Sequence, residues 1–137
     1  MQDRPTRHEL LTAVREFLEN DVVPALDGPK KFHARVAANV LAIIDRELQM
    51  EAAQLALEWR RLDALLDDAP ELPATLDAQR RGIAERTEAV CARIRHGDAD
   101  AGDWRAAVMA HTRQTVNEKL AVANPKFLEA DERAARR

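Results

Sequence analysis

The chain has no serine, no tyrosine, one cysteine and only four glycines among its 137 residues. Without serine there is no serine nucleophile and no Gly-x-Ser-x-Gly elbow, and without tyrosine there is no phenolic acid. The single thiol, Cys91, cannot close an internal disulfide, which fits a reducing compartment. Scarce glycine combined with abundant alanine, leucine, glutamate and arginine favours helix.

Other absences restrict the location and the partners. No apolar run approaches the roughly 20 residues of a membrane span, and the N-terminal MQDRPTRHEL lacks the apolar core of a signal peptide. We therefore expect a cytoplasmic protein without a membrane partner. The net charge of −3 argues against nucleic acid, whose binding usually needs a basic face.

The length and the apolar spacing predict an all-α protein with a single domain. Apolar residues recur at i, i+3, i+4 and i+7 through most of the chain, as on the buried face of a helix. We expect an antiparallel bundle of about five helices with short connections over residues 1–127, followed by a charged, flexible tail over 128–137. The expected helices cover about 6–24, 29–48, 52–66, 74–96 and 103–123.

Local signals fix several helix ends. Thr6 and Glu9 have the spacing of a capping box, and Pro24 limits the first helix. Gly97 supplies a left-handed stop, and Asp103 is expected to cap the last helix, which ends before Asn124–Pro125. Around residues 49–53 the apolar pattern loses its phase, which predicts a break or kink.

The segment Phe32–Leu48 is apolar or alanine on nearly all sides, which is typical of a helix in the middle of a bundle. The alanines Ala34, Ala38 and Ala42, with Trp59 or Trp104, could alternatively form a contact between copies of the chain.

Lys30 and Lys31 lie in the first turn of this helix, where cations oppose the helix dipole. Two interpretations are open: an anion site for a phosphate or carboxylate, or two solvated lysines in a surface turn. His33 follows in the same turn and is either a general base or pH switch, or a histidine hydrogen-bonded to a neighbour such as Asp27.

Arg35 and Asn39 are spaced i, i+4 on one edge of the same helix. They either bridge to an acidic residue of another helix and fix its register, or face a ligand or partner. Candidate ligand- or partner-binding residues are thus Lys30, Lys31, His33, Arg35 and Asn39.

No motif predicts a metal, a cofactor or a catalytic centre. The chain has no Gly-rich phosphate loop, no Cys/His zinc spacing and no glutamate-x-x-histidine pair. The loop Asp98–Asp103 fails the calcium-loop pattern, because Gly102 stands at its fifth position and Met109 at its twelfth. Cys91 is expected to be a small core thiol. We predict a protein that is not an enzyme.

Three segments carry a family resemblance: RPTRHELLTAVREFLENDVVPALDG, FHARVAANVLAIIDREL and KLAVANPKF. Together they resemble a family of small bacterial proteins of uncharacterised domain type, and the resemblance covers about residues 2–127. The stretch 50–95 matches only in its general helical character.

This resemblance implies a function. Members of the family are commonly encoded beside an aminoglycoside-phosphotransferase-like kinase and an acyl-CoA dehydrogenase. In hydroxy-acid catabolism such a small protein acts with the kinase that phosphorylates a hydroxyacyl-CoA. The resemblance therefore implies a non-catalytic accessory subunit of the kinase. The alternatives are a bundle that binds acyl-CoA or another small anion, and a structural homo-oligomer such as a homodimer.

Overall fold

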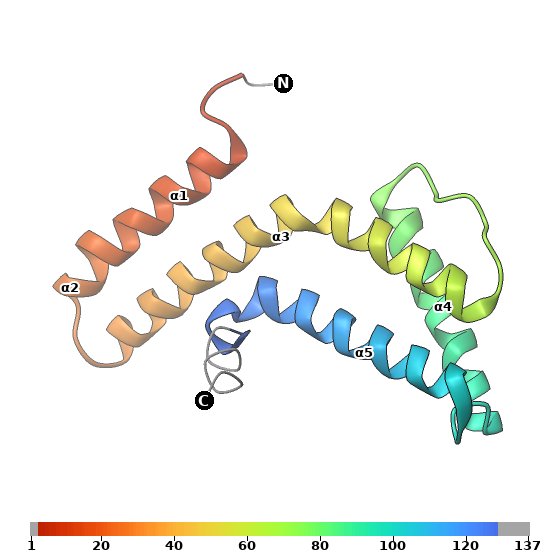
Figure 1. Cartoon of the computed structure of the whole chain (residues 1–137). Helices are drawn as coiled ribbons and strands as arrows, with labels where there is room; N and C mark the ends of the chain where they lie inside the picture. Colours follow the sequence, from red (N-terminus) through yellow and green to blue (C-terminus); the bar gives the residue numbers. More distant parts are fainter. Residues whose placement is uncertain (1–2, 129–137) are drawn as a thin grey trace. The chain divides into compact units, whose positions relative to one another are not determined.

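The computed structural model describes residues 3–128, and all regular structure in that range is helical (Figure 1). The predicted all-α fold class is confirmed. The described residues fall into two compact units, divided between Gln49 and Met50: unit 1 precedes this boundary and unit 2 follows it. The predicted tail, apart from Leu128, lies outside the described residues. The elements are α1 (Arg7–Phe17), the π-helical η1 (Leu18–Val22), α2 (Val23–Ala25), α3 (Gly28–Leu66), α4 (Leu76–His96) and α5 (Gly102–Ala123).

The first helix begins as the sequence predicts. The Thr6 hydroxyl accepts a hydrogen bond from the Glu9 N–H at 3.2 Å, and the Glu9 carboxylate accepts one from the Thr6 N–H at 2.6 Å. This capping box satisfies two N–H groups that the helix itself cannot pair.

Pro24 has a subtler effect than the predicted limit. The residues before it form a π-helical turn, in which the Val23 N–H donates to the Leu18 carbonyl five residues back. A proline lacks an N–H and crowds the carbonyl four residues before it, and a widened turn accommodates both effects. The chain then stays helical to Ala25 and leaves the helix at Leu26.

The predicted break near residues 49–53 is wrong, because α3 is one continuous helix of 39 residues. The apolar pattern changes phase because the neighbours of the helix change. Up to Gln49, α3 contacts α1, and from Met50 it contacts α4 and α5. Periodicity therefore reports which face is buried rather than where a helix ends.

Unit 1 is a helical hairpin in which α1 and the first half of α3 run antiparallel (Figure 1). Ala34 and Ala38 are buried at the seam, where small side chains let two helices approach closely. The predicted central position of Phe32–Leu48 is wrong within this unit. One face of the helix is buried and the other is exposed, including Phe32 at 63% exposure.

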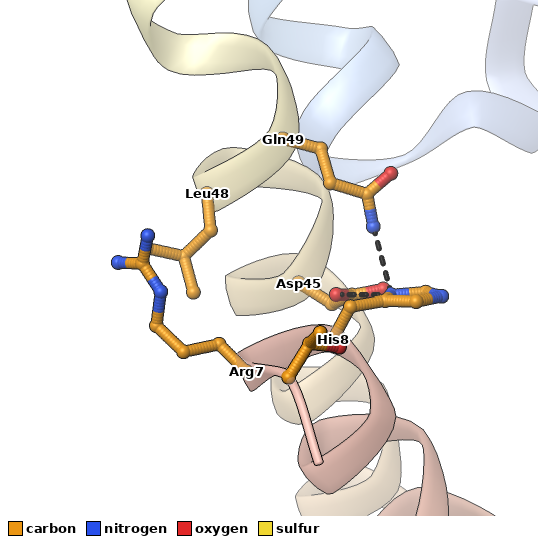
Figure 2. A pocket seen from close by; sticks show the side chains of 6 residues that line it. Arg7, His8, Asp45, Leu48 and Gln49 are labelled. Atoms are coloured by element: carbon orange, nitrogen blue, oxygen red, sulfur yellow. Dashed lines mark hydrogen bonds and ion pairs between the residues drawn. The ribbon is translucent and has the colours of Figure 1, made fainter. Parts of the chain in front are cut away.

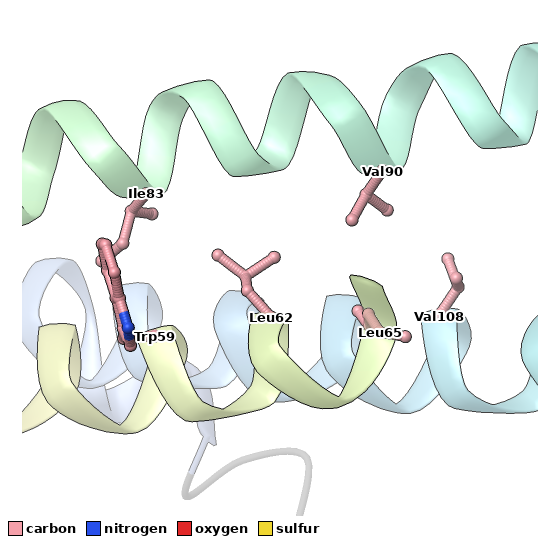
Figure 3. Packing of buried hydrophobic residues seen from close by; sticks show 6 residues of the cluster. All are labelled: Trp59, Leu62, Leu65, Ile83, Val90 and Val108. Carbon is pink, nitrogen blue, oxygen red and sulfur yellow. The ribbon is translucent and has the colours of Figure 1, made fainter. Parts of the chain in front are cut away.

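Unit 2 is formed by the second half of α3 with α4 and α5. Their shared core consists of Trp59, Leu62, Leu65, Ile83, Val90 and Val108 (Figure 3). Helix α5 runs antiparallel to α3: Trp104 near its start donates to the Leu65 carbonyl, and Glu118 near its end pairs with Arg61.

Helix α4 departs from the expected antiparallel arrangement, because it runs in the same direction as the second half of α3. Arg80 near the start of α4 pairs with Glu51, and Arg93 near its end donates to the Leu65 carbonyl. The contacts therefore advance along both helices in the same order. A parallel pair needs a connection that returns to the start of the first helix, and the non-helical residues 67–75 provide it. The gap between the expected helices 52–66 and 74–96 is confirmed as a loop, but this loop is a crossover and not a tight turn.

Two arginines in unit 2 are packed onto tryptophan rings. The Arg86 guanidinium lies 4.7 Å from the centroid of Trp59 and pairs with Asp63 and Asp68. Arg93 lies 4.2 Å from the Trp104 ring. Trp59 is only 6% exposed, so the expectation that it offers a surface for a second copy is wrong.

Most of the remaining helix ends follow the sequence. Gly97 ends α4 in the left-handed conformation with a φ of 99°, and Asn124 ends α5. The prediction that Asp103 caps α5 is wrong, since Ala101 occupies the cap position. The Asp103 carboxylate lies in the first turn instead, where its negative charge interacts favourably with the helix dipole. Within residues 3–128, none of the helices has the length and apolar character needed to cross a bilayer.

Candidate functional site

A polar cluster joins α1 to α3 within unit 1 (Figure 2). His8 Nδ1 lies 2.7 Å from Asp45 Oδ1 and 3.0 Å from the Gln49 amide nitrogen. The hydrogen bond from His8 lowers the pKa of the Asp45 carboxyl below its ordinary value. These residues are separated by about 40 positions in the sequence, so helical spacing could not have paired them.

A histidine held by a carboxylate is the arrangement that activates a nucleophile in many hydrolases. Here the hydroxyl that lines the same cavity belongs to Thr6, and it accepts the N–H of Glu9 as a helix cap. The cavity measures only about 220 Å³, less than the roughly 300 Å³ at which ligand pockets begin. The cluster therefore acts as a polar clamp between the two helices of the hairpin.

The predicted site residues are only partly brought together. Arg35 and Asn39 line a cavity of about 290 Å³ with Glu19 and Val23 of the preceding helical turns. Lys30, Lys31 and His33 are not among the residues that line it. The Lys30 and His33 side chains are exposed. The His33 and Phe32 rings lie edge to face, with their centroids 5.7 Å apart.

The part of α3 in unit 1 has an exposed face that carries large apolar side chains. Five large apolar side chains at i, i+4 spacing form one row along the helix, which we call the α3 row, and each is between 40% and 63% exposed. Three more exposed apolar residues lie on α1. The α3 row comprises Phe32, Val36, Val40, Ile44 and Leu48, and the α1 residues are Leu10, Val14 and Phe17.

A groove of about 690 Å³ lies in unit 2 between α4 and α5, with a floor from α3. We call it the α4–α5 groove. Its lining is mostly apolar, with threonines, one histidine, one cysteine and a few charged groups. The lining residues that matter below are Ile83, Val90, Cys91, Ile94, Val108, His111, Val116 and Lys119.

His111 lines this groove and has a lowered pKa. Burial lowers its pKa below 6.5, the nearby Arg61 charge lowers it further, and Glu58 and Glu118 oppose the shift. Its Nδ1 atom is buried without a hydrogen-bond partner among the described residues. The imidazole is therefore a neutral polar group in a largely apolar wall at neutral pH.

Sequence reasoning missed both the clamp and the groove. The clamp depends on a contact between helices far apart in the sequence. The groove depends on the unexpected direction of α4, although its lining residues recur at helical spacing along α4 and α5. Cys91 was expected in the core and is instead half-buried in the groove wall.

In the described part of the chain, no three His, Cys, Asp or Glu side chains are placed to hold a metal ion. Comparisons with curated proteins and with solved structures find no match. A family model described as a domain of unknown function matches residues 24–127, which include the whole of the α3 row and of the α4–α5 groove. Because this match spans most of the chain, the protein belongs to the family named DUF6285, a domain of unknown function.

Proposed function

We propose that this protein is a non-catalytic accessory subunit that binds an aminoglycoside-phosphotransferase-like kinase of hydroxy-acid or acyl-CoA catabolism. The kinase as partner comes from the family resemblance of the sequence. The α3 row is the observation that supports a protein-binding role, because its five apolar residues stand exposed on one helix.

The size of this surface supports docking. The α3 row exposes on the order of 400 Å² of side-chain surface, comparable with the largest apolar patch of a typical monomer, which is often functional. A standard interface takes about 800 Å² from each partner. Leu10, Val14 and Phe17 on α1 of the same unit add apolar surface toward that figure.

The test is co-expression of the tagged protein with the kinase encoded beside its gene. We expect the two to co-purify in near-equal amounts and the kinase rate to change when the protein is added. Val36→Lys combined with Val40→Lys places two charges in the row and should abolish both effects. Met109→Lys is the matched control, because Met109 is also exposed but lies on α5 in unit 2. A kinase that neither co-purifies nor changes its rate would refute the proposal.

A second candidate is a homodimer through the same row, since an apolar row can meet its own copy. Light scattering distinguishes the two. A dimer that the Val36→Lys, Val40→Lys variant converts to monomer, with no kinase bound, would assign the row to a second copy.

The ligand interpretation at Lys30, Lys31, His33, Arg35 and Asn39 stays a prediction. The cavity beside Arg35 and Asn39, at about 290 Å³, is also smaller than the roughly 300 Å³ at which ligand pockets begin, and it adds no support to this interpretation. CoA esters at 100 times their Kd should stabilise the fold by roughly 2.7 kcal/mol. An unchanged melting temperature with CoA esters would count against it.

A further inference from the structure

We propose that the α4–α5 groove of unit 2 binds an aliphatic carboxylate, with the chain along the groove and the carboxylate at Lys119. This site is separate from the α3 row in unit 1 and does not rest on the kinase proposal. Its volume of about 690 Å³ falls within the roughly 300–1,000 Å³ of small-molecule sites.

The two basic residues that line the groove lie at the same end of it. The contacts with α3 order the helices: Arg80 lies beside Glu51, whereas Arg93 and Trp104 both reach Leu65. Because α4 and α5 run in opposite directions, Lys119 and Arg80 share one end. Val90, Ile94 and Val108 line the other end. A ligand that fits this arrangement of residues has one charged head and one apolar chain.

The sign of the head follows from the charges that are already paired. Arg80 pairs with Glu51 and Asp77, and Glu88 pairs with Arg95. Lys119, by contrast, has no ion-pair partner within residues 3–128. Glu58 also lines the groove, from the α3 side, and likewise has no ion-pair partner within residues 3–128. A carboxylate head avoids Glu58 by lying on the α5 side, against the ammonium group of Lys119.

The length of the chain follows from the helix. Val108 and Lys119 are 11 positions apart on α5, which corresponds to about 16 Å of helix. An extended alkyl chain advances about 1.3 Å per carbon, so roughly ten to twelve carbons span about 11–14 Å, and the reach of the Lys119 side chain covers the rest. Between the ends, His111 and the threonines offer polar contacts without charge at neutral pH.

Cys91 gives a direct measure of occupancy, because it lines the groove and is the only thiol of the chain. The experiment follows the rate of Cys91 modification by a small thiol reagent in the full-length protein, with decanoate below its micelle concentration. We expect decanoate at ten times its Kd to slow the modification about tenfold. Acetate, which has the head without the chain, should leave the rate unchanged.

Two variants test the position of the ligand. Lys119→Gln should raise the Kd of decanoate about fivefold, the effect expected from one partly exposed charge pair. Ala84→Trp, on the groove wall, should remove the protection by decanoate, whereas Ala89→Trp on the exposed part of α4 should not. Far-UV circular dichroism verifies that each variant is folded.

Three results would overturn the proposal. The first is an unchanged modification rate with decanoate. The second is equal protection by decyltrimethylammonium, since a cationic head should be repelled by Lys119. The third is protection that depends on protein concentration alone and accompanies a dimer in light scattering, which would assign the groove to a second copy. None of these results bears on kinase binding by the α3 row.

Discussion

Replacing Gly82 by alanine should destabilise unit 2, although the same replacement stabilises most helices. Gly82 lies inside α4 and faces the Trp59 ring of α3. A Cβ atom added at Gly82 would stand 2.7 Å from Trp59 Cζ3 and 3.0 Å from Cη2. Real Cβ contacts are essentially never that short, so the ring or the helix must move.

The ring is not free to move. Trp59 is 6% exposed, its Nε1 donates to the Pro70 carbonyl at 3.1 Å, and the Arg86 guanidinium covers one face. Overpacking of a core costs about 1–3 kcal/mol, and alanine gains about 1 kcal/mol over glycine in helix propensity. The net expectation for Gly82→Ala is therefore a loss of up to about 2 kcal/mol.

A double-mutant cycle makes the reasoning refutable. Phenylalanine at position 59 lacks the two atoms that meet the new methyl group, so in a Trp59→Phe background Gly82→Ala should gain up to about 1 kcal/mol. Urea unfolding followed by far-UV circular dichroism measures all four proteins. Ala89→Gly, on the exposed face of α4, is the propensity control and should lose about 1 kcal/mol. A stabilised Gly82→Ala single variant, or the same effect in both backgrounds, would refute the clash.

Three further predictions concern the cap, the buried arginine and the groove histidine. Thr6→Ala should cost about 1 kcal/mol in urea unfolding, because the Glu9 N–H loses its acceptor; an unchanged midpoint would contradict the capping box. Arg86→Ala should lower the free energy of unfolding by about 3 kcal/mol, because Asp63 loses its partner in a mostly buried site. Adding Asp63→Asn to this variant should restore part of the lost stability, and no restoration would refute the pairing. The pKa of His111 is lowered in the fold, so the unfolded chain takes the proton first as the pH falls below 6.5. Stability is therefore retained above that pH and lost below it, and the melting temperature of His111→Gln should fall less between pH 7 and 5.5; an equal fall would contradict the shift.

Sequence reasoning succeeded where the determinants are local. The Thr6–Glu9 capping box, the left-handed Gly97 and the end of α5 at Asn124 each depend on a few neighbouring residues, and all are confirmed. It failed at residues 49–53, where the phase change was interpreted as a break. The pattern of apolar residues describes the surroundings of a helix, and those surroundings change between unit 1 and unit 2 while the backbone stays helical.

The candidate sites, too, could be predicted only where they depend on neighbouring residues of the chain. The α3 row belongs to a segment that the sequence shows as apolar or alanine on nearly all sides. The exposure of the row could not be predicted, since spacing cannot show whether anything covers a face. His8 and Asp45 were both present in the sequence without any signal that they meet across 37 positions.

The sequence by itself therefore determined the helical class, most of the helix ends and the apolar faces, because capping, propensity and periodicity act over one or two turns. Only the tertiary structure decided that α4 runs parallel to the second half of α3, that Trp59 is buried beneath Arg86, and that a groove opens between α4 and α5. These features depend on which faces meet, and that choice depends on the packing of residues distant in the chain.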